Sequence, residues 1–310
     1  MKRAILASVA GILMTLASTP GLAVAQEVPG PQGPESGASR RQPWLLPIPG
    51  ERLLMHAIVL RPPGAGPFPL AVINHGSIQS EQIRERYQMR EYPIASQWLL
   101  AHGYAIVLPL RPGHGETGGP YFEDQGRCDS PDYRRAGLRA ADSIEAAISY
   151  MTAQPFVRKS GTVVAGHSAG GWGALALASR NPEGMRAVIN FAGGRGGRSE
   201  NKPNHNCAPD RLIASAGEFG RSARIPTLWL YSENDSLFAP PLSRAMYEAF
   251  RGAGGRAEYH LLPAFGRDGH GFIDMADAAG LWAPIVEAFL ARQQLSARSS
   301  VLDGLAWPAP

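Results

Sequence analysis

The stretch "TVVAGHSAGGWGALALASR", residues 162–180, joins an apolar run to a run of small residues through a cluster of glycines. Its first part is typical of a buried strand, and its last part is typical of a helix. Between them lies Gly166-His167-Ser168-Ala169-Gly170, a Gly-x-Ser-x-Gly pattern at a strand-to-helix turn. A serine at such a turn adopts a strained backbone, and flanking glycines avoid clashes with the neighbouring elements. The stretch therefore predicts an α/β fold and makes Ser168 a candidate nucleophile.

Strand-like and helix-like segments alternate on both sides of this stretch. The pattern predicts strands at 53–62, 69–76, 104–110, 161–166, 186–194, 225–235 and 257–263. It predicts helices at 92–103, 131–155, 169–180, 240–254 and 278–293. Apolar strands that alternate with helices favour a mainly parallel sheet covered by helices on both faces. Because there is no second set of elements, we expect a single domain over residues 45–293 without a large cap domain.

The composition indicates a globular protein. Of the 310 residues, 44% are hydrophobic and 18% are charged, and the net charge is +4. The positive charge comes from scattered arginines and not from a Lys/Arg run, so a nucleic-acid partner is not expected. The sequence contains no indication of the oligomeric state.

The N-terminal stretch "MKRAILASVAGILMTLASTPGLAVAQ" has the features of an export signal. A charged start precedes a short apolar run, and Ala23-Val24-Ala25 supplies the small residues that a signal peptidase requires. The apolar run is shorter than the ~18 residues of a membrane-spanning helix. We therefore predict a signal peptide over 1–25, a secreted or periplasmic protein, and no stable membrane insertion after cleavage. Residues 26–44 are expected to form a flexible lead-in, and residues 294–310 a loose C-terminal tail.

Two polar segments, 111–132 and 194–223, interrupt the alternation. Each follows a predicted parallel strand at its C-terminal end, where open α/β sheets place their ligand sites. Each also contains one of the two cysteines, Cys128 and Cys207. In an exported protein such a pair is a candidate disulfide, which would join the two loops over the site; two free thiols are the alternative.

A serine hydroxyl needs a base to act as a nucleophile, and the base needs an orienting acid. Asp235 follows the predicted strand 225–235 and is the candidate acid, with Glu233 as the competing carboxylate. His270 lies in a glycine-flanked loop after the next strand and is the candidate base. The order Ser168, Asp235, His270 is the order in which α/β-hydrolases carry their catalytic triad.

Two further residues near these candidates have simpler interpretations. Asp268 lies two residues before His270 in the same loop, and we interpret it as a loop-bracing carboxylate. His167 is held in the same turn as Ser168, and we interpret it as a neighbour of the nucleophile and not as the base. The start of the following helix places the Ala169 N–H where it faces a developing oxyanion.

Residues 45–293 resemble the α/β-hydrolases, in particular the dienelactone hydrolase-like and related secreted esterases. The resemblance rests on "NHGS" (74–77), "GHSAGG" (166–171), "SENDSLFAP" (232–240) and "GHGF" (269–272). It implies that Ser168 is the nucleophile, Asp235 the acid and His270 the base. It also implies that the Ser77 N–H completes the oxyanion hole with that of Ala169. The founding dienelactone hydrolases use a cysteine nucleophile, so the serine favours general carboxylic ester hydrolysis.

Several side chains are expected near the substrate. The pocket candidates are Tyr121, Phe122, Trp172 and Phe238 as an aromatic wall, with His114 either lining the pocket or bonding its own loop. Arg111, Arg127 and Arg195 either pair with a substrate carboxylate, brace the loops or remain solvated. The histidines lack metal-ligand spacing and the glycine-rich "AGGRGG" (192–197) lacks a nucleotide pattern, so we expect no metal and no cofactor.

These observations predict a serine esterase that acts on small to medium esters through an acyl-enzyme, with a small-molecule ester as its partner. Two alternatives remain. The first is a serine peptidase or amidase similar to the catalytic domain of prolyl oligopeptidases, although those usually carry an extra N-terminal domain. The second is a catalytically silent binding protein of the same fold, which would lack a triad residue; none is missing here.

Overall fold

The computed structural model describes residues 27–295. The predicted signal peptide and nearly all of the predicted C-terminal tail lie outside the described residues. Within residues 27–295, no helix combines the length and apolar character needed to cross a membrane.

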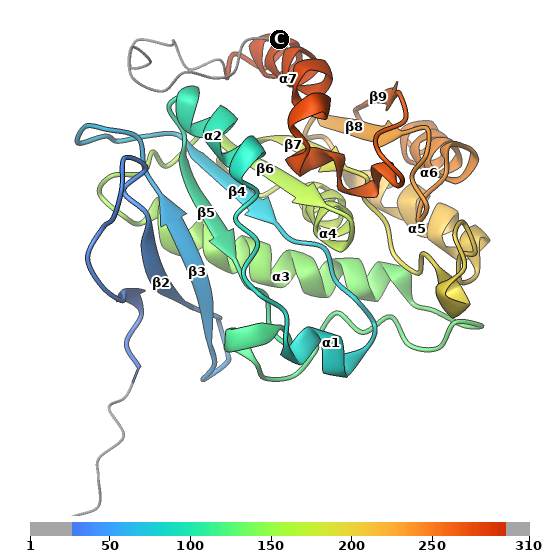
Figure 1. The fold of residues 1–310 in the computed structure, drawn as a ribbon, viewed down its shortest axis with the longest axis horizontal. Coiled ribbons are helices and arrows are strands. Elements are labelled where there is room, and N and C mark those ends of the chain that lie inside the picture. The colour runs from blue at the N-terminus through green and yellow to red at the C-terminus, as the bar shows by residue number, and fades with distance from the viewer. Residues whose placement is uncertain (1–26, 296–310) are drawn as a thin grey trace, which may run out of the picture.

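Nine strands of the described chain form one sheet, in the order β1-β2-β3-β5-β4-β6-β7-β8-β9 (Figure 1). The strands are β1 (Gly30–Pro31), β2 (Gln42–Pro47), β3 (Leu54–Leu60), β4 (Leu70–Asn74), β5 (Ala105–Pro109), β6 (Thr162–His167), β7 (Met185–Phe191), β8 (Thr227–Ser232) and β9 (Ala257–Leu262). From β5 to β9 every neighbouring pair is parallel, whereas β1, β2 and β3 add an antiparallel edge. The predicted mainly parallel sheet is confirmed.

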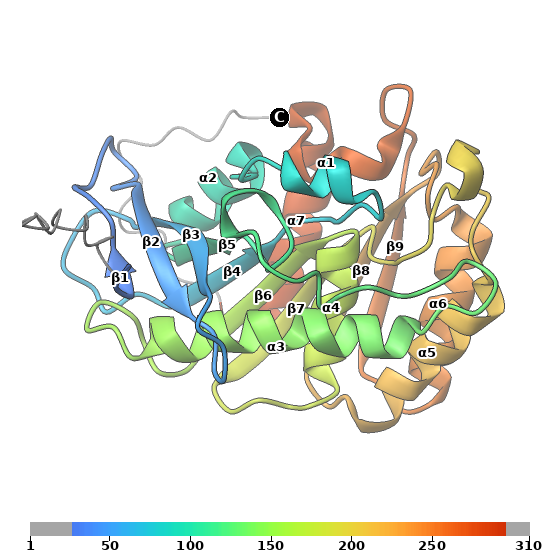
Figure 2. The same cartoon turned by 90° about the horizontal axis from the view of Figure 1, so that it is seen from below.

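Helices cover both faces of this sheet, as predicted. They are α1 (Glu81–Glu85), α2 (Pro93–Ala101), α3 (Tyr133–Thr152), α4 (Ala169–Ala178), α5 (Pro209–Ser222), α6 (Pro240–Gly252) and α7 (Ala276–Arg292). Helices α2 and α7 pack together on one face, and α3, α4, α5 and α6 lie on the other (Figures 1 and 2). All ten residues of α4 are buried, because it lies between the sheet and the outer helices α3 and α5.

Parts of the segment predicted as a flexible lead-in, residues 26–44, are paired in the sheet. Strand β1 pairs with β2, and β2 pairs with β3 from Gln42 to Pro47. Trp44 in β2 is buried and packs edge-on against Phe156, with ring centroids 6.0 Å apart. Pro31 lies in β1, the edge strand of the sheet, where prolines are tolerated because one side of the strand needs no partner. The Pro/Gly-rich composition of this segment therefore did not predict strands β1 and β2.

The predicted disulfide between Cys128 and Cys207 is confirmed. It joins two loops 79 residues apart in the sequence, with the Cα atoms 4.8 Å apart. Under the chain-entropy account, closing a loop of this length stabilises the fold by about 4 kcal/mol. The segment 194–223 is not wholly irregular as expected, because it ends in the helix α5 (Pro209–Ser222).

Candidate active site

Ser168 lies at the sharp turn between β6 and α4, at the C-terminal edge of the parallel strands. Its backbone has φ 55° and ψ −122°, a strained conformation for a residue with a side chain. The turn is fixed because the Ser168 N–H donates to the Phe191 carbonyl at 3.0 Å, and the Ser168 carbonyl accepts from Gly194 N–H at 3.2 Å. A side chain on Gly166 would overlap the backbone of Gly170. The turn therefore requires the small residues that the sequence places there.

Asp235 and His270 follow β8 and β9 and meet beside this turn. The His270 Nδ1 atom lies 3.0 Å from both carboxylate oxygens of Asp235. Asp235 is buried, and its Oδ1 also accepts from the N–H groups of Leu237 and Phe238, at 2.8 and 2.9 Å. A carboxylate bonded to Nδ1 holds the hydrogen on that nitrogen and leaves Nε2 free to accept a proton. The pair thus has the geometry of an oriented general base.

The loop after β4 brings Gly76 directly against Ser168. A Cβ atom built on Gly76 would lie 3.1 Å from Ser168 Cβ and 3.6 Å from its Oγ. Neither the Ser77 N–H nor the Ala169 N–H has an acceptor among residues 27–295. The Ser168 hydroxyl also has no hydrogen-bond partner in the described chain. In structures without substrate, the hydrogen bond between a serine nucleophile and its base is often long.

Asp268 and His167 both make contacts within the loops around Ser168 and His270. Asp268 accepts from the backbone N–H groups of Ser236 and His270, at 3.1 and 3.0 Å, and makes no bond to the imidazole ring. His167 Nε2 lies 2.8 Å from the His270 carbonyl. Burial and the neighbouring His270 lower the pKa of His167 to about 3, so it is neutral at pH 7. Both residues hold the loop that carries His270. Glu233, the competing carboxylate, is exposed.

Solved structures of low sequence identity share this architecture. A protein described as a dienelactone hydrolase from Klebsiella pneumoniae is similar over 82% of this chain and 98% of its own, with a TM-score of 0.55 and 19% identity. An esterase from Pyrococcus furiosus is similar over 86% of this chain and 99% of its own, with a TM-score of 0.58 and 15% identity. The chain has the α/β-hydrolase fold.

Two further comparisons concern peptidases. Residues 91–194 match the prolyl oligopeptidase family. An acylaminoacyl peptidase from Pyrococcus horikoshii is similar over 84% of this chain but only 42% of its own, with a TM-score of 0.58 and 13% identity. No curated protein matches the chain at a significant level.

Ser168 opens into a cleft of about 730 Å³, a size typical of small-molecule sites. Phe238 lines this cleft, and its ring lies 5.6 Å from that of His270. The two disulfide cysteines line the cleft as well, so the bond between them forms part of its wall. Tyr121 and His114 lie behind the wall, where both bond to the side chain of Ser77.

Of the five predicted pocket residues only Phe238 lines the cleft; besides Tyr121 and His114, Trp172 and Phe122 also lie outside its lining. Trp172 is fully buried, packs against Phe219 and donates its indole N–H to the Tyr133 carbonyl at 2.8 Å. The prediction is wrong because α4 turns this residue toward α3 and α5 and away from the cleft. Phe122 is half-buried outside the cleft wall.

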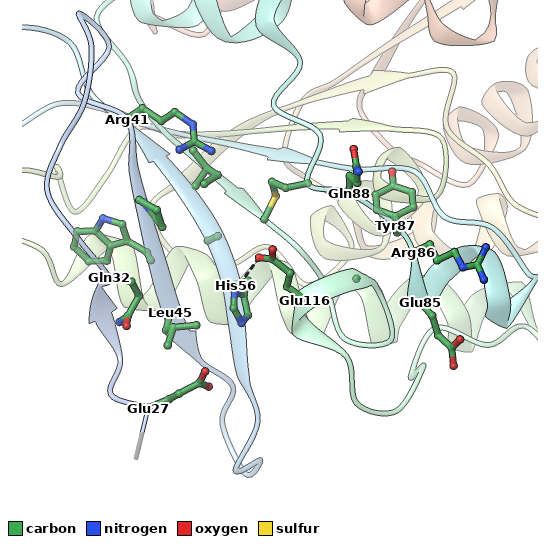
Figure 3. A pocket seen from close by; sticks show the side chains of 16 residues that line it. Glu27, Gln32, Arg41, Leu45, His56, Glu85, Arg86, Tyr87, Gln88 and Glu116 are labelled. Atoms are coloured by element: carbon green, nitrogen blue, oxygen red, sulfur yellow. Dashed lines mark ion pairs between the residues drawn. The ribbon is translucent and has the colours of Figure 1, made fainter. Parts of the chain in front are cut away.

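A second hollow of about 710 Å³ lies between the β2–β3 edge and the segment that follows α1 (Figure 3). Charged groups of both signs line it, including Arg41, Glu85 and Glu116. His56 Nδ1 lies 3.5 Å from Glu116 Oε2 in its wall. Ser168, Asp235 and His270 do not line this hollow, so the cleft beside Ser168 is the candidate substrate site.

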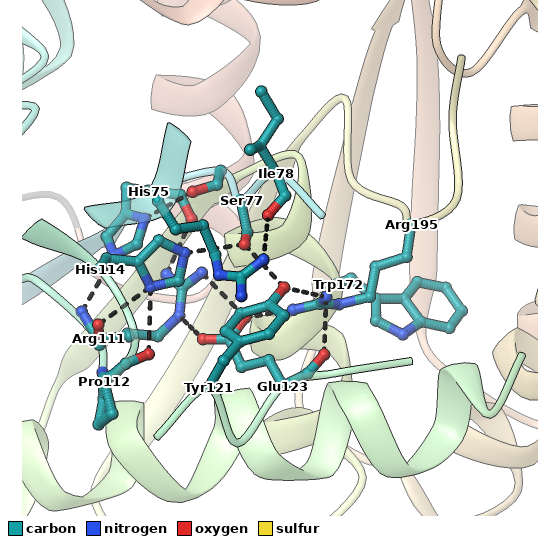
Figure 4. Close-up of polar contacts among 12 residues, drawn as sticks. His75, Ser77, Ile78, Arg111, Pro112, His114, Tyr121, Glu123, Trp172 and Arg195 are labelled. Atoms are coloured by element: carbon teal, nitrogen blue, oxygen red, sulfur yellow. Dashed lines mark hydrogen bonds and ion pairs between the residues drawn. The ribbon is translucent and has the colours of Figure 1, made fainter. Parts of the chain in front are cut away.

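Sequence reasoning missed a buried ion cluster beside the site (Figure 4). Glu123 forms ion pairs with both Arg111 and Arg195, and all three side chains are almost fully buried. Burial alone would raise the pKa of Glu123, but the two guanidinium groups lower it to about 2. Arg111 and Arg195 therefore already share a carboxylate partner in Glu123, and of the two only Arg195 lines the cleft. The third arginine, Arg127, is exposed and pairs with Asp129.

Substituting Glu123 with glutamine should lower the free energy of unfolding by about 3–5 kcal/mol, because two buried guanidinium groups lose their counter-charge. Equilibrium unfolding in urea measures this loss. Glu145→Gln is the matched control, since Glu145 pairs with Arg180 at the surface and should contribute about 0–1 kcal/mol. Equal losses in the two variants would contradict a special role for burial.

Proposed function

We propose that this chain is a serine hydrolase that cleaves carboxylic esters of small to medium size. The observation that carries the proposal is that Ser168 lines the cleft on a strained turn, next to a loop whose His270 is oriented by a buried aspartate. Export to an oxidising compartment is part of the proposal, because structural disulfides such as Cys128–Cys207 persist there.

In the proposed mechanism His270 Nε2 accepts the proton of the Ser168 hydroxyl as Oγ attacks the ester carbonyl carbon. Asp235 keeps the imidazole in the required tautomer and stabilises the imidazolium that forms. The tetrahedral intermediate collapses when its C–O bond to the alcohol breaks, and His270 returns the proton to the leaving alcohol. Water then attacks the acyl-enzyme, with His270 acting as base again, and the carboxylic acid leaves.

The negative charge of the tetrahedral intermediate needs donors that are already in place. The N–H groups of Ala169 and Ser77 are the candidates, because both lie beside Ser168 and neither has an acceptor in the described chain. Removal of one such donor in other hydrolases costs about 3 kcal/mol of transition-state stabilisation.

Peptide bond cleavage is the second candidate function. It is favoured by the match of residues 91–194 to the prolyl oligopeptidase family. The triad chemistry is the same for both bonds, and the difference lies in the leaving group, which for a peptide is an amine that must be protonated. We favour esters because the cleft is walled by the disulfide loops and has the size of a small-molecule site.

The test compares leaving groups directly. The protein lacking residues 1–25 should hydrolyse p-nitrophenyl acetate, butyrate or octanoate far faster than N-acyl amino-acid p-nitroanilides. A fluorophosphonate should label it, forming a phosphorus–oxygen bond to Ser168 with loss of fluoride, and mass spectrometry should locate the label on the peptide that contains Ser168. Faster anilide turnover would favour the peptidase. Absence of both turnover and labelling would overturn the proposal.

A further inference from the structure

Ser77 lines the cleft, and its side chain is held from two sides. Its Oγ lies 2.8 Å from His114 Nε2 and 2.8 Å from the Tyr121 hydroxyl (Figure 4). All three residues come from loops at the C-terminal edge of the sheet, and 37 and 44 positions separate Ser77 from its two partners. Two such contacts restrict the rotation of a short side chain and, with it, the orientation of the adjacent backbone N–H.

The direction of the first hydrogen bond follows from the surroundings of His114. Its Nδ1 lies 3.0 Å from the Arg111 carbonyl and 3.2 Å from the Pro112 carbonyl, and carbonyls only accept. Nδ1 therefore carries the hydrogen. Burial lowers the pKa of His114 to about 4, with Glu123 opposing and Arg111 adding to the shift, so the ring is neutral at pH 7. Its Nε2 is then an acceptor, and the Ser77 hydroxyl donates to it.

The direction of the hydrogen bond between Ser77 and Tyr121 follows from that of the first. Because the Ser77 hydrogen is used on His114, Ser77 Oγ accepts from the Tyr121 hydroxyl. The Tyr121 oxygen accepts from Arg195 Nη1 at 3.1 Å. The Tyr121 ring is also fixed, since the Arg84 guanidinium carbon lies 3.7 Å from its centroid. Hydrogen bonds thus run in one direction from Arg195 through Tyr121 and Ser77 to His114.

The other end of the same loop is held by the buried ion cluster. Arg111 Nη1 donates to the His75 carbonyl at 2.8 Å, and the Arg111 N–H donates to His75 Nε2 at 3.0 Å. Gly76, between the two anchored residues, lies against Ser168. The short segment from His75 to Ser77 is therefore tied down on both sides of the point where it faces the nucleophile.

We propose that Tyr121 and His114 are positioning residues, which hold the Ser77 N–H toward the oxyanion by fixing the Ser77 hydroxyl. This inference rests on the proposed hydrolase function. The hydroxyl of Ser77 is not itself the oxyanion donor, because its hydrogen is directed at His114. The backbone N–H alone serves that purpose, and the side chain acts as its anchor.

Tyr121→Phe is the sharpest test, because it removes only the hydroxyl and retains the ring under Arg84. We expect kcat for p-nitrophenyl butyrate to fall by about 10- to 100-fold with little change in KM, since the lost interaction serves the transition state. Tyr247→Phe is the matched control. It removes a tyrosine hydroxyl from α6 that bonds the Ala257 carbonyl at 3.5 Å, and should leave kcat unchanged.

A thionoester substrate separates positioning from a general loss of structure. Sulfur accepts hydrogen bonds poorly, so the thiono reaction depends less on the oxyanion hole. The ratio of oxoester to thionoester kcat should therefore fall in Tyr121→Phe and stay at the wild-type value in Tyr247→Phe. His114→Gln retains an acceptor near the Nε2 position and should keep more of the wild-type ratio than His114→Leu.

The outcomes distinguish this inference from the proposed function. If the wild type hydrolyses the oxoester and Ser168 is labelled, but Tyr121→Phe keeps both kcat and the oxo-to-thiono ratio, the positioning role is overturned while the hydrolase function stands. A fall in kcat with an unchanged ratio also overturns it, because the loss would then arise elsewhere. A wild type without turnover or labelling overturns both.

Discussion

Substitution of Ser168 with alanine should lower kcat for ester hydrolysis by about 10⁶-fold, the loss seen when a triad nucleophile is removed. The reason is chemical, because alanine retains the Cβ atom and loses only the oxygen that forms the acyl-enzyme. The strained backbone of the turn, with φ 55°, remains the same for alanine. The melting temperature should therefore change little, and thermal unfolding measured beside the kinetics separates lost chemistry from lost fold.

Ser179→Ala provides a control for this substitution. Ser179 lies at the opposite end of α4 from Ser168 and outside the lining of the cleft, and its hydroxyl donates to the Ala176 carbonyl at 2.6 Å. Its removal should leave kcat at the wild-type level. Wild type and variant are purified in the same way, so that a contaminating esterase can be excluded. Turnover that then survives in Ser168→Ala would show that another group is the nucleophile.

The parallel strands were predictable because the sequence of each strand shows a recognisable apolar run. Strands buried on both faces are continuous apolar runs, so the predicted strand at 104–110 appears as β5 (Ala105–Pro109), and that at 69–76 as β4 (Leu70–Asn74). The antiparallel edge was not predictable in this way. Strand β2 depends on pairing with β3, and its two prolines, Pro43 and Pro47, favour an irregular segment when considered locally.

The same distinction applies to the site. Ser168, Asp235 and His270 each follow a predicted strand, so topology alone places them at one edge of the sheet. The pairing of Glu123 with Arg195 spans 72 positions between two irregular loops, and no periodicity marks either residue. Trp172 was misplaced for a related reason. Which face of a helix meets the cleft depends on the helices packed around it, and here α3 and α5 cover Trp172.

Asp235→Asn should lower kcat by about 10⁴-fold, through the tautomer of His270 and not through lost structure. Asp235 Oδ1 accepts from the N–H groups of Leu237 and Phe238. The asparagine carbonyl can keep these two bonds only if its NH₂ group faces His270 Nδ1. That nitrogen must then accept, so the ring hydrogen moves to Nε2. A protonated Nε2 cannot remove the proton of Ser168, and kcat measured across pH 6–9 should remain low throughout.

Asp268→Asn is the matched control, because it also replaces one carboxylate oxygen with an NH₂ group, in a second aspartate close to His270. Asp268 accepts from the backbone N–H groups of Ser236 and His270 and does not touch the ring, so its amide preserves the tautomer. We expect it to lower kcat by about 10-fold or less, because a small shift of the loop would move His270 slightly from its best position. A larger loss in Asp268→Asn than in Asp235→Asn would make Asp268 the acid. The 3.0 Å contacts between Asp235 and the His270 ring predict the opposite order, because only a carboxylate bonded to the ring determines which nitrogen carries the hydrogen.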